Sequence, residues 1–211
     1  MIITFEGIDG VGKTTQAHKL QEYLTANRKN AYYTQEPGWD NLVSKLLRTM
    51  LMSSETTPRQ KMFMLLADRA AHFDKWVSSV MSNPVGPANP IIVMDRGPDS
   101  LVAYQGFGQG LAPLPWLLEA NLIAMGRRMP DITILLDMKD PSEALARVER
   151  KDYYEGLDAA FYNRVRNGYL EIAKAEERFI VIDADQSKEK IHIDIVTKIT
   201  EKMANTSVQG Q

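Results

Sequence analysis

The sequence predicts a single α/β domain in which a five-stranded parallel sheet is covered by helices on both faces. The first observation is a set of short apolar runs rich in β-branched and aromatic residues, namely Ile2–Phe5, Ala31–Thr34, Pro90–Met94, Ile132–Leu136 and Phe179–Ile182. The second is that segments with helical spacing separate these runs. Because the runs are apolar throughout rather than alternating, we expect strands buried on both faces. Strands that alternate with helices favour βαβ units and therefore a parallel sheet.

The helical segments are recognised by apolar residues three or four positions apart. The stripes span Ala17–Leu24, Leu42–Leu51, Met62–Trp76 and Ile191–Met203, and Arg69 interrupts the third. Breaker-rich stretches at 82–89 and 106–115 predict surface loops. The tail 204–211 lacks an apolar pattern and is expected to be frayed. The sequence has no internal repeat, so residues 1–211 are expected to form one domain.

Composition excludes several classes of protein. The chain has 211 residues and no cysteine, which rules out a disulfide scaffold, a thiolate zinc site and a cysteine nucleophile. Lys and Arg number 25 against 27 Asp and Glu, so the net charge is −2 and binding to nucleic acid or to a membrane surface is not expected. No apolar run approaches the roughly 20 residues of a membrane span. Residues 1–6 look like a first strand rather than a signal peptide, so we expect a cytoplasmic protein.

The first predicted strand leads into residues 7–14, which match the pattern G-x-x-x-x-G-K-[ST] in full. Glycines allow backbone N–H groups to approach a polyphosphate without obstruction by a Cβ atom. Lys13 is expected to reach the β- and γ-phosphates, and the Thr14 hydroxyl to ligate Mg²⁺. The residues predicted to bind the nucleotide are Gly7, Asp9, Gly10, Gly12, Lys13, Thr14 and Thr15. The alternative is a glycine turn that merely joins a strand to a helix.

The motif indicates a nucleotide site without fixing the reaction. A GTPase should carry an N-K-x-D guanine reader and a D-x-x-G switch, and outside the phosphate loop the sequence contains neither pattern. A motor-type ATPase usually needs a longer chain and an arginine from a neighbouring subunit. A small-molecule kinase needs a second basic site for an acceptor phosphate and a lid that carries cations.

Asp95 and Arg96 follow the third apolar run. A carboxylate at the carboxyl end of a central strand is expected to organise the magnesium ion. A bidentate guanidinium beside it would clamp the donor and acceptor phosphates together. The alternative is that Asp95 caps the next helix and that Arg96 is solvated.

Several segments resemble the thymidylate kinase family. Residues 95–106 are similar to its D-R-Y-x-D-S-S-x-A-Y-Q-G segment, residues 5–15 to F-E-G-x-D-G-x-G-K-T-T, and residues 34–38 to T-R-E-P-G. Arg48 and the ranges 67–69 and 130–137 also match in order and spacing. The match runs from about residue 2 to residue 184, and it implies a P-loop kinase fold with a short lid.

The resemblance implies ATP-dependent phosphorylation of dTMP to dTDP with Mg²⁺, carried out by a homodimer. Carried over by position, Asp9 would hold the deoxyribose 3′-hydroxyl, and Arg48 and Arg96 would hold the acceptor phosphate. Arg69 and Gln105 would read the edge of the pyrimidine. Simpler interpretations stay open. Asp9 could cap the phosphate-loop turn, and Arg48 and Arg69 could be solvated or ion-paired. For Arg69, an unpaired charge within an apolar stripe would be costly.

The same resemblance places further residues around the acceptor. Tyr104 would pack under the sugar and disfavour a 2′-hydroxyl, and Ser100 would complete the acceptor site. Glu36 would lie near the metal and the acceptor phosphate, and Pro37 is a candidate cis peptide. The alternatives are a core aromatic for Tyr104 and an ordinary loop carboxylate for Glu36.

A lid is predicted at about 147–156, where Arg147, Arg150 and Lys151 follow a short helix. The phosphate loop has no arginine between Gly7 and Lys13, so cations from elsewhere must balance the charge of the transition state. Arg150 is the first choice for this catalytic role, with Arg147 and Lys151 behind it. The alternative is a solvated, charged helix end.

Three residues depart from the family pattern around the predicted acceptor. Leu65 stands where the family usually has a stacking Phe, Leu101 replaces the second Ser of D-S-S, and Gln35 replaces the Arg of T-R-E-P-G. Either dTMP is still the substrate, or the pocket accepts 5-substituted deoxyuridylates or several deoxynucleotides. An alternative of a different class is a non-catalytic, nucleotide-binding regulatory protein.

Overall fold

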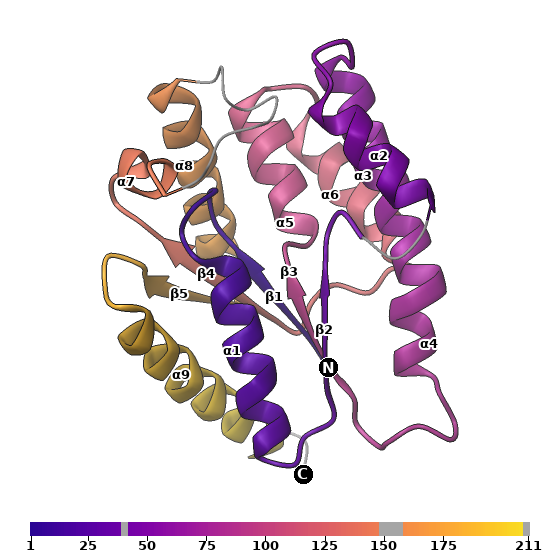
Figure 1. Ribbon diagram of the computed structural model, residues 1–211, viewed down its shortest axis with the longest axis vertical. Helices are drawn as coiled ribbons and strands as arrows, with labels where there is room; N and C mark the ends of the chain where they lie inside the picture. The colour runs from indigo at the N-terminus through magenta and orange to yellow at the C-terminus, as the bar shows by residue number, and fades with distance from the viewer. Residues whose placement is uncertain (39–41, 148–157, 209–211) are drawn as a thin grey trace.

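The computed structural model describes residues 1–38, 42–147 and 158–208. Within these ranges a five-stranded parallel sheet has the order β2-β3-β1-β4-β5 (Figure 1). The strands are β1 Ile2–Glu6, β2 Ala31–Gln35, β3 Ile91–Asp95, β4 Ile132–Asp137 and β5 Phe179–Asp183. This architecture confirms the predicted fold class, and each strand ends one residue later than its apolar run indicated.

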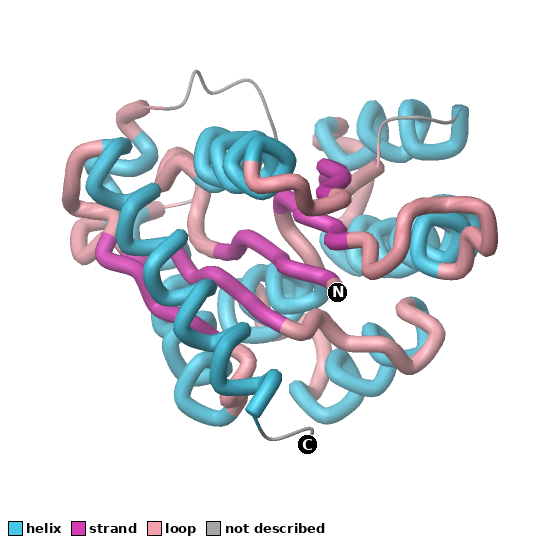
Figure 2. The backbone as a smooth tube through the Cα atoms, turned by 90° about the horizontal axis from the view of Figure 1, so that it is seen from below, coloured by secondary structure: helices cyan, strands magenta, loops and turns pink. Residues whose placement is uncertain are grey.

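The helices lie on both sides of the sheet (Figure 2). They are α1 Lys13–Ala26, α2 Leu42–Met52, α3 Pro58–His72, η1 Phe73–Val77, α4 Ser78–Met81, α5 Pro98–Leu101, η2 Val102–Gly108, α6 Leu114–Ala124, α7 Pro141–Leu145, α8 Ala159–Ala175 and α9 Lys188–Val208, where η marks a π-helical turn. The third predicted stripe, Met62–Trp76, therefore lies in α3 and η1, and the helix continues beyond it as α4. None of the described helices is both long and apolar enough to cross a lipid bilayer.

Alternate residues of the central strands pack against different helices, as the pleat requires. Ile3 and Phe5 are fully buried in one core cluster with Leu20 of α1 and Ile195 of α9. On the opposite face, Ile2 and its sheet neighbours join a second cluster with η1. The register pairs Ile2 with Ile92 and Phe5 with Asp95, so the functional end of β3 lies beside the end of β1.

The opposite face of β1 changes from apolar to polar along its length. Ile2 is followed on that face by Thr4 and Glu6, which are all fully buried. The hydroxyls of Thr4 and Thr133 lie 2.9 Å apart, and Thr133 belongs to the neighbouring strand β4. Because carboxyl ends of parallel strands meet at one edge, these polar side chains lead toward the loops that form the site.

Two sequence predictions need correction. Residues 106–108, expected in a surface loop, are the end of the helical turn η2, and Gly106 and Gly108 are buried. A Cβ on Gly106 would lie 2.8 Å from Leu114 Cδ2, and one on Gly108 would lie 2.7 Å from Phe161 Cε2, so these glycines permit close packing rather than a loop. Residues 204–208, expected to be frayed, continue helix α9 to Val208.

Candidate active site

The phosphate loop joins β1 to α1 through three glycines in backbone conformations that side chains rarely adopt. Gly7, Gly10 and Gly12 have φ angles of 136°, 83° and 98°. A Cβ on Gly7 would lie only 2.5 Å from the Leu136 carbonyl oxygen. Glycine is thus required both by conformation and by the close approach of β4.

Lys13 lies across this loop. Its ammonium donates a hydrogen bond to the Ile8 carbonyl at 2.7 Å and lies 4.0 Å from Asp9 Oδ1. Burial, and next the nearby Arg96, lower the pKa of Lys13 to about 8 against the opposing effect of the carboxylates. An anionic ligand at this position would restore the preference for the charged ammonium.

Two cavities meet beside the phosphate loop. The larger, of about 330 Å³, is lined by Asp9, Thr14, Gln35, Glu36, Pro37, Arg48, Leu51, Leu65, Arg69, Asp95, Arg96, Ser100, Leu101, Tyr104 and Gln105. The smaller, of about 270 Å³, is lined by Asp9, Gly10, Gly12, Lys13, Thr14, Thr15, Asp95, Arg96 and Arg147. Both cavities share Asp9, Thr14, Asp95 and Arg96. The arrangement suits two phosphorylated ligands whose phosphates meet at these shared residues.

Arg96 lies at the junction of the cavities. Its φ angle is 66°, a left-handed conformation that is uncommon for a residue with a side chain. Its Nη2 forms an ion pair with Asp9 Oδ1, and the Tyr104 hydroxyl donates to Asp9 Oδ2 at 3.0 Å. Burial opposes ionisation of Asp9, but Arg96 and Lys13 hold its pKa below the usual value. The junction therefore carries a fixed guanidinium beside an ionised carboxylate.

Thr14 and Asp95 provide oxygens that suit magnesium. The Thr14 hydroxyl donates to Asp95 Oδ2. Asp95 Oδ1 is buried and has no hydrogen-bond partner among the described residues, so one carboxylate oxygen is available to a cation or its water shell. Mg²⁺ keeps several waters and takes few protein ligands, which these two residues fit. In the described parts of the chain, no cluster of three or more His, Cys, Asp and Glu side chains forms a metal cage.

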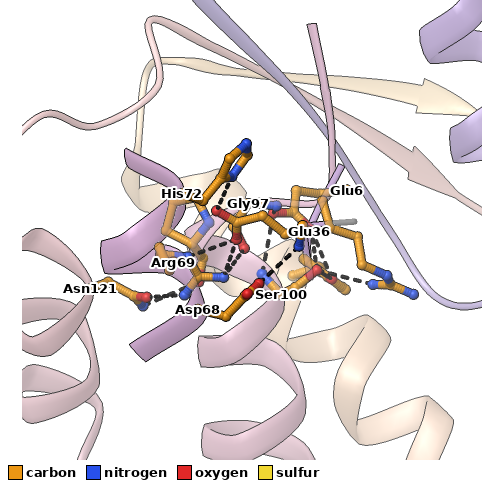
Figure 3. Close-up of polar contacts among 12 residues, drawn as sticks. Glu6, Glu36, Asp68, Arg69, His72, Gly97, Ser100 and Asn121 are labelled. Carbon is orange, nitrogen blue, oxygen red and sulfur yellow. Dashed lines mark hydrogen bonds and ion pairs between the residues drawn. The ribbon is translucent and has the colours of Figure 1, made fainter. Parts of the chain in front are cut away.

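Glu36 and Arg69 form a buried ion pair in the wall of the larger cavity (Figure 3). Glu36 Oε2 accepts from Arg69 Nε at 2.8 Å, and its Oε1 lies 3.4 Å from His72 Nδ1. The guanidinium also donates to the side chain of Asn121 and, at 2.9 Å, to the Gly97 carbonyl. Burial opposes ionisation of Glu36, but Arg69 and His72 lower its pKa. This cluster joins β2, α3, α6 and the turn after β3.

Comparison with known proteins agrees with this geometry. A family model described as thymidylate kinase matches residues 5–195. The thymidylate kinase of Maridesulfovibrio salexigens is 38% identical over 96% of this chain and 96% of its own length. That of Nitratidesulfovibrio vulgaris is 36% identical over 98% of this chain and 95% of its own. The chain belongs to the thymidylate kinase family.

A solved structure supports the same assignment. The crystal structure of thymidylate kinase from Ehrlichia chaffeensis aligns with a TM-score of 0.74 at 31% identity, and it covers 95% of this chain and 98% of its own. The likeness therefore extends over nearly the whole of both chains.

The predicted site residues of this thymidylate kinase family member line the two cavities, except for Gly7, which is buried and lines neither, and for residues of the lid. Every predicted acceptor residue lines the larger cavity, and Leu65 and Leu101 form part of its apolar wall. The predicted cis peptide is present between Glu36 and Pro37. Arg147 is exposed and lines the smaller cavity. Arg150 and Lys151, with the rest of 148–156, lie outside the described residues.

Sequence reasoning missed several residues that hold the site together. His72 was not predicted as a site residue, yet it is buried between Glu36 and Thr34, whose Oγ1 lies 2.8 Å from His72 Nε2. Asn121 is 1% exposed and donates to the Pro98 carbonyl at 3.1 Å. Both lie on helices with many apolar neighbours, so a polar residue on a buried face was the available signal.

Proposed function

We propose that the protein transfers the γ-phosphoryl group of ATP to dTMP and produces dTDP. The observation that carries this proposal is the pair of cavities that share Asp95 and Arg96 and of which only the smaller reaches Lys13. Membership of the thymidylate kinase family identifies the acceptor class. Phosphoryl transfer needs little covalent chemistry from the protein, so alignment and charge neutralisation are its contributions.

The smaller cavity would hold the polyphosphate of ATP. Gly10, Gly12 and Lys13 would bind the phosphate oxygens, and Thr14 with Asp95 would hold a magnesium ion through its water shell. Bound Mg²⁺ would neutralise charge on the β- and γ-phosphate oxygens. Arg147, which also lines this cavity, would reach the same phosphates. Arg150 and Lys151 are proposed as further lid cations.

The larger cavity would hold dTMP. Arg48 and Arg96 would bind its phosphate, and Asp9 would accept a hydrogen bond from the 3′-hydroxyl while Tyr104 packs under the sugar. Glu36 would act through Arg69 and stand near the metal and the acceptor phosphate. Ser100 lies beside Arg96 at the phosphate end.

The pyrimidine would lie against the apolar wall of this cavity. Leu65 and Leu101 supply that wall, and Gln105 lines it. Arg69 would read a base carbonyl, because its Nη1 carries two protons and donates one of them to Asn121. Glu36 and Asn121 thereby orient the guanidinium before substrate binds.

A substrate panel tests the reaction. ADP release is measured with dTMP, dUMP, dGMP and 5-hydroxymethyl-dUMP, and we expect kcat/KM for dTMP to exceed the others. Comparable rates for the bulkier 5-substituted nucleotide would indicate a reshaped pocket around Leu65 and Leu101. No turnover with any of the four would contradict the proposed function and favour a nucleotide-binding regulatory protein.

A homodimer formed through α3 and α6 would account for an exposed apolar face. Helix α6 is apolar on nearly every side, yet Trp116, Leu118 and Ile123 are exposed by 42%, 42% and 63%. Phe63 of α3 stands beside Trp116, with the ring centroids 5.9 Å apart. By helical spacing Ile123 shares the side of α6 that carries Trp116, and Leu118 lies on another side. Exposed large apolar side chains that gather in this way favour an interface in soluble proteins. We expect light scattering to show a dimer that Ile123→Glu converts to monomer, and a monomeric wild-type protein would contradict this assignment.

We also propose that the protein carries out this reaction in the cytoplasm.

A further inference from the structure

Glu6 is a buried carboxylate for which the proposed reaction has no direct use. It ends strand β1, is fully buried, and lies beneath the turn that follows β3 (Figure 3). Its Oε1 accepts the backbone N–H groups of Gly97 at 2.9 Å and Ser100 at 3.2 Å. Its Oε2 accepts the hydroxyls of Ser100 at 2.6 Å and Tyr169 at 3.0 Å. Two backbone N–H groups and two hydroxyls surround the carboxyl group, and the two hydroxyl oxygens lie 2.8 Å from each other. With all four groups donating to it, this environment favours an ionised carboxylate.

The Ser100 hydroxyl connects Glu6 to the cleft. It has one proton, which it donates to Glu6, so its lone pairs face Arg96 Nη1 at 3.0 Å. The other terminal nitrogen of Arg96 pairs with Asp9. The guanidinium is therefore held between a carboxylate at the cleft surface and a hydroxyl whose orientation is set by Glu6.

The same carboxylate also holds the backbone that presents Arg96. The residue has a φ angle of 66°, and its own N–H donates to the Phe5 carbonyl at 3.0 Å. Its successor Gly97 is bound to Glu6 Oε1. A residue in an unfavourable conformation persists only where its surroundings fix it. Glu6 holds this turn by accepting hydrogen bonds from the backbone N–H groups of Gly97 and Ser100 and from the Ser100 hydroxyl.

We propose that ionised Glu6 is a positioning residue that aims Arg96 at the acceptor phosphate through Ser100 and the Gly97 backbone. This inference rests on the proposed function, because it concerns how Arg96 meets the phosphate of dTMP. Protonated Glu6 would lose the charge that strengthens these hydrogen bonds. An O–H group on its Oε2 would donate to the Ser100 or Tyr169 hydroxyl, which would then turn its own proton away from Glu6. Arg96 would then lose its fixed orientation while Asp9 still attracts it.

The surroundings of Glu6 place the protonation of its carboxyl group near neutral pH. Burial, and next the like charge of Asp99, raise the pKa of Glu6 to about 7, against the opposing effects of Ser100, Arg96 and Tyr169. Asp99 itself is paired with Arg178 at 2.7 Å. Lys13 and Glu6 also interact electrostatically, and Glu6 raises the pKa of Lys13. Activity that depends on ionised Glu6 should therefore decline as the pH falls below about 7.

The test compares the wild-type protein with Glu6→Gln, which keeps the shape of the side chain but removes its charge. The ratio of kcat/KM for dTMP, wild type over variant, is measured from pH 5.5 to 8.5. Ionisation of the dTMP phosphate affects both proteins and cancels in this ratio. We expect a ratio of about 10 to 100 at pH 8.5, because Glu6→Gln loses charge-assisted hydrogen bonds. The ratio should fall toward 1 below pH 6, where Glu6 of the wild type is itself protonated. A ratio that does not change with pH would overturn the proposal.

A second variant keeps the proposal testable if Glu6→Gln does not fold. Tyr169→Phe removes one donor to Glu6, which raises the pKa of the carboxyl group, so the acid limb of kcat/KM should move to higher pH. An unmoved limb would contradict the proposal. Thr4→Val is the matched control, since Thr4 is equally buried on the same face of β1 but bonds to Thr133. It should keep the wild-type pH profile.

The outcome is distinguishable from failure of the proposed function. If the wild-type protein does not phosphorylate dTMP at any pH, the proposed function fails. If it does so with a ratio to Glu6→Gln that is independent of pH, only the role of Glu6 fails. ATP binding of each variant, measured by calorimetry, should stay close to that of the wild type and shows that the variant is folded.

Discussion

The phosphate loop and the wall of the acceptor cavity are built in different ways. Residues 7–15 form the loop as one contiguous segment, and its shape depends on three glycines with positive φ angles. The acceptor wall joins Glu36 of the β2–α2 connection, Arg69 of α3 and Asn121 of α6, which are separated by 33 and 52 residues along the chain. The first region is specified by local backbone conformation, and the second by buried charge pairing.

This difference predicts how activity and stability should respond when a charged side chain is removed from each region. Removing a charge from the phosphate loop removes a ligand contact but leaves the loop backbone intact. Removing a charge from the acceptor wall leaves its partner buried without compensation, and this penalty is large in a protein interior. Activity and stability should therefore separate in the phosphate loop and fall together in the acceptor wall.

Glu36→Gln should have the largest effect on stability. The change leaves Arg69, whose side chain is 4% exposed, with a buried charge and no anionic partner. We expect the free energy of unfolding to fall by about 3–5 kcal/mol, measured by urea denaturation at pH 7. Because Arg69 and His72 lower the pKa of Glu36, this stabilisation is present above the usual pKa of a glutamate and is lost as the pH falls through the lowered value.

Glu119→Gln is the matched control for that experiment. Glu119 forms an exposed pair with Arg127, with a separation of 3.1 Å and side chains exposed by 53% and 68%. Such pairs contribute little, so the variant should unfold close to the wild-type denaturant midpoint. Equal losses from the two variants would show that charge burial does not distinguish the acceptor wall.

Lys13→Met should reduce activity without loss of stability. Removal of a preorganised cation at the transferring phosphate costs about 10²–10³ in kcat. Burial already disfavours the charged ammonium and lowers the pKa of Lys13 to about 8, so a neutral side chain of similar size should leave the free energy of unfolding unchanged or higher at pH 7. Steady-state kinetics and thermal unfolding check the two parts. A large drop in melting temperature would mean that Lys13 supports the fold, and the contrast between the two regions would fail.

The apolar runs predicted the position of every strand, but each run ended one residue before the observed strand end. The observed final residues are Glu6, Gln35, Asp95, Asp137 and Asp183. A criterion based on apolarity stops before a polar residue, although the strand hydrogen bonds continue through it. Of these residues, Gln35 and Asp95 line the larger cavity and Glu6 lies beneath it, so the apolar criterion failed where the site begins.

The helical turn η2 shows another limit of sequence reasoning. Gly106 and Gly108 read as loop residues because glycine is common in turns. Their actual role is to let η2 approach α6 and α8, since a Cβ at either position would lie under 3 Å from a neighbouring side chain. Close approach between segments distant in sequence leaves no local pattern.

The sequence by itself determined the alternation of strands and helices, the phosphate loop and the family, because each depends on residues that are adjacent or regularly spaced. It also identified the cations and carboxylates of the cleft one at a time. The tertiary structure decided their partners. Glu36 pairs with Arg69, Arg96 pairs with Asp9, and Glu6 accepts a hydrogen bond from the Ser100 hydroxyl. Charges buried within one cleft compete for the same partners, and only the folded geometry decides which pairs form.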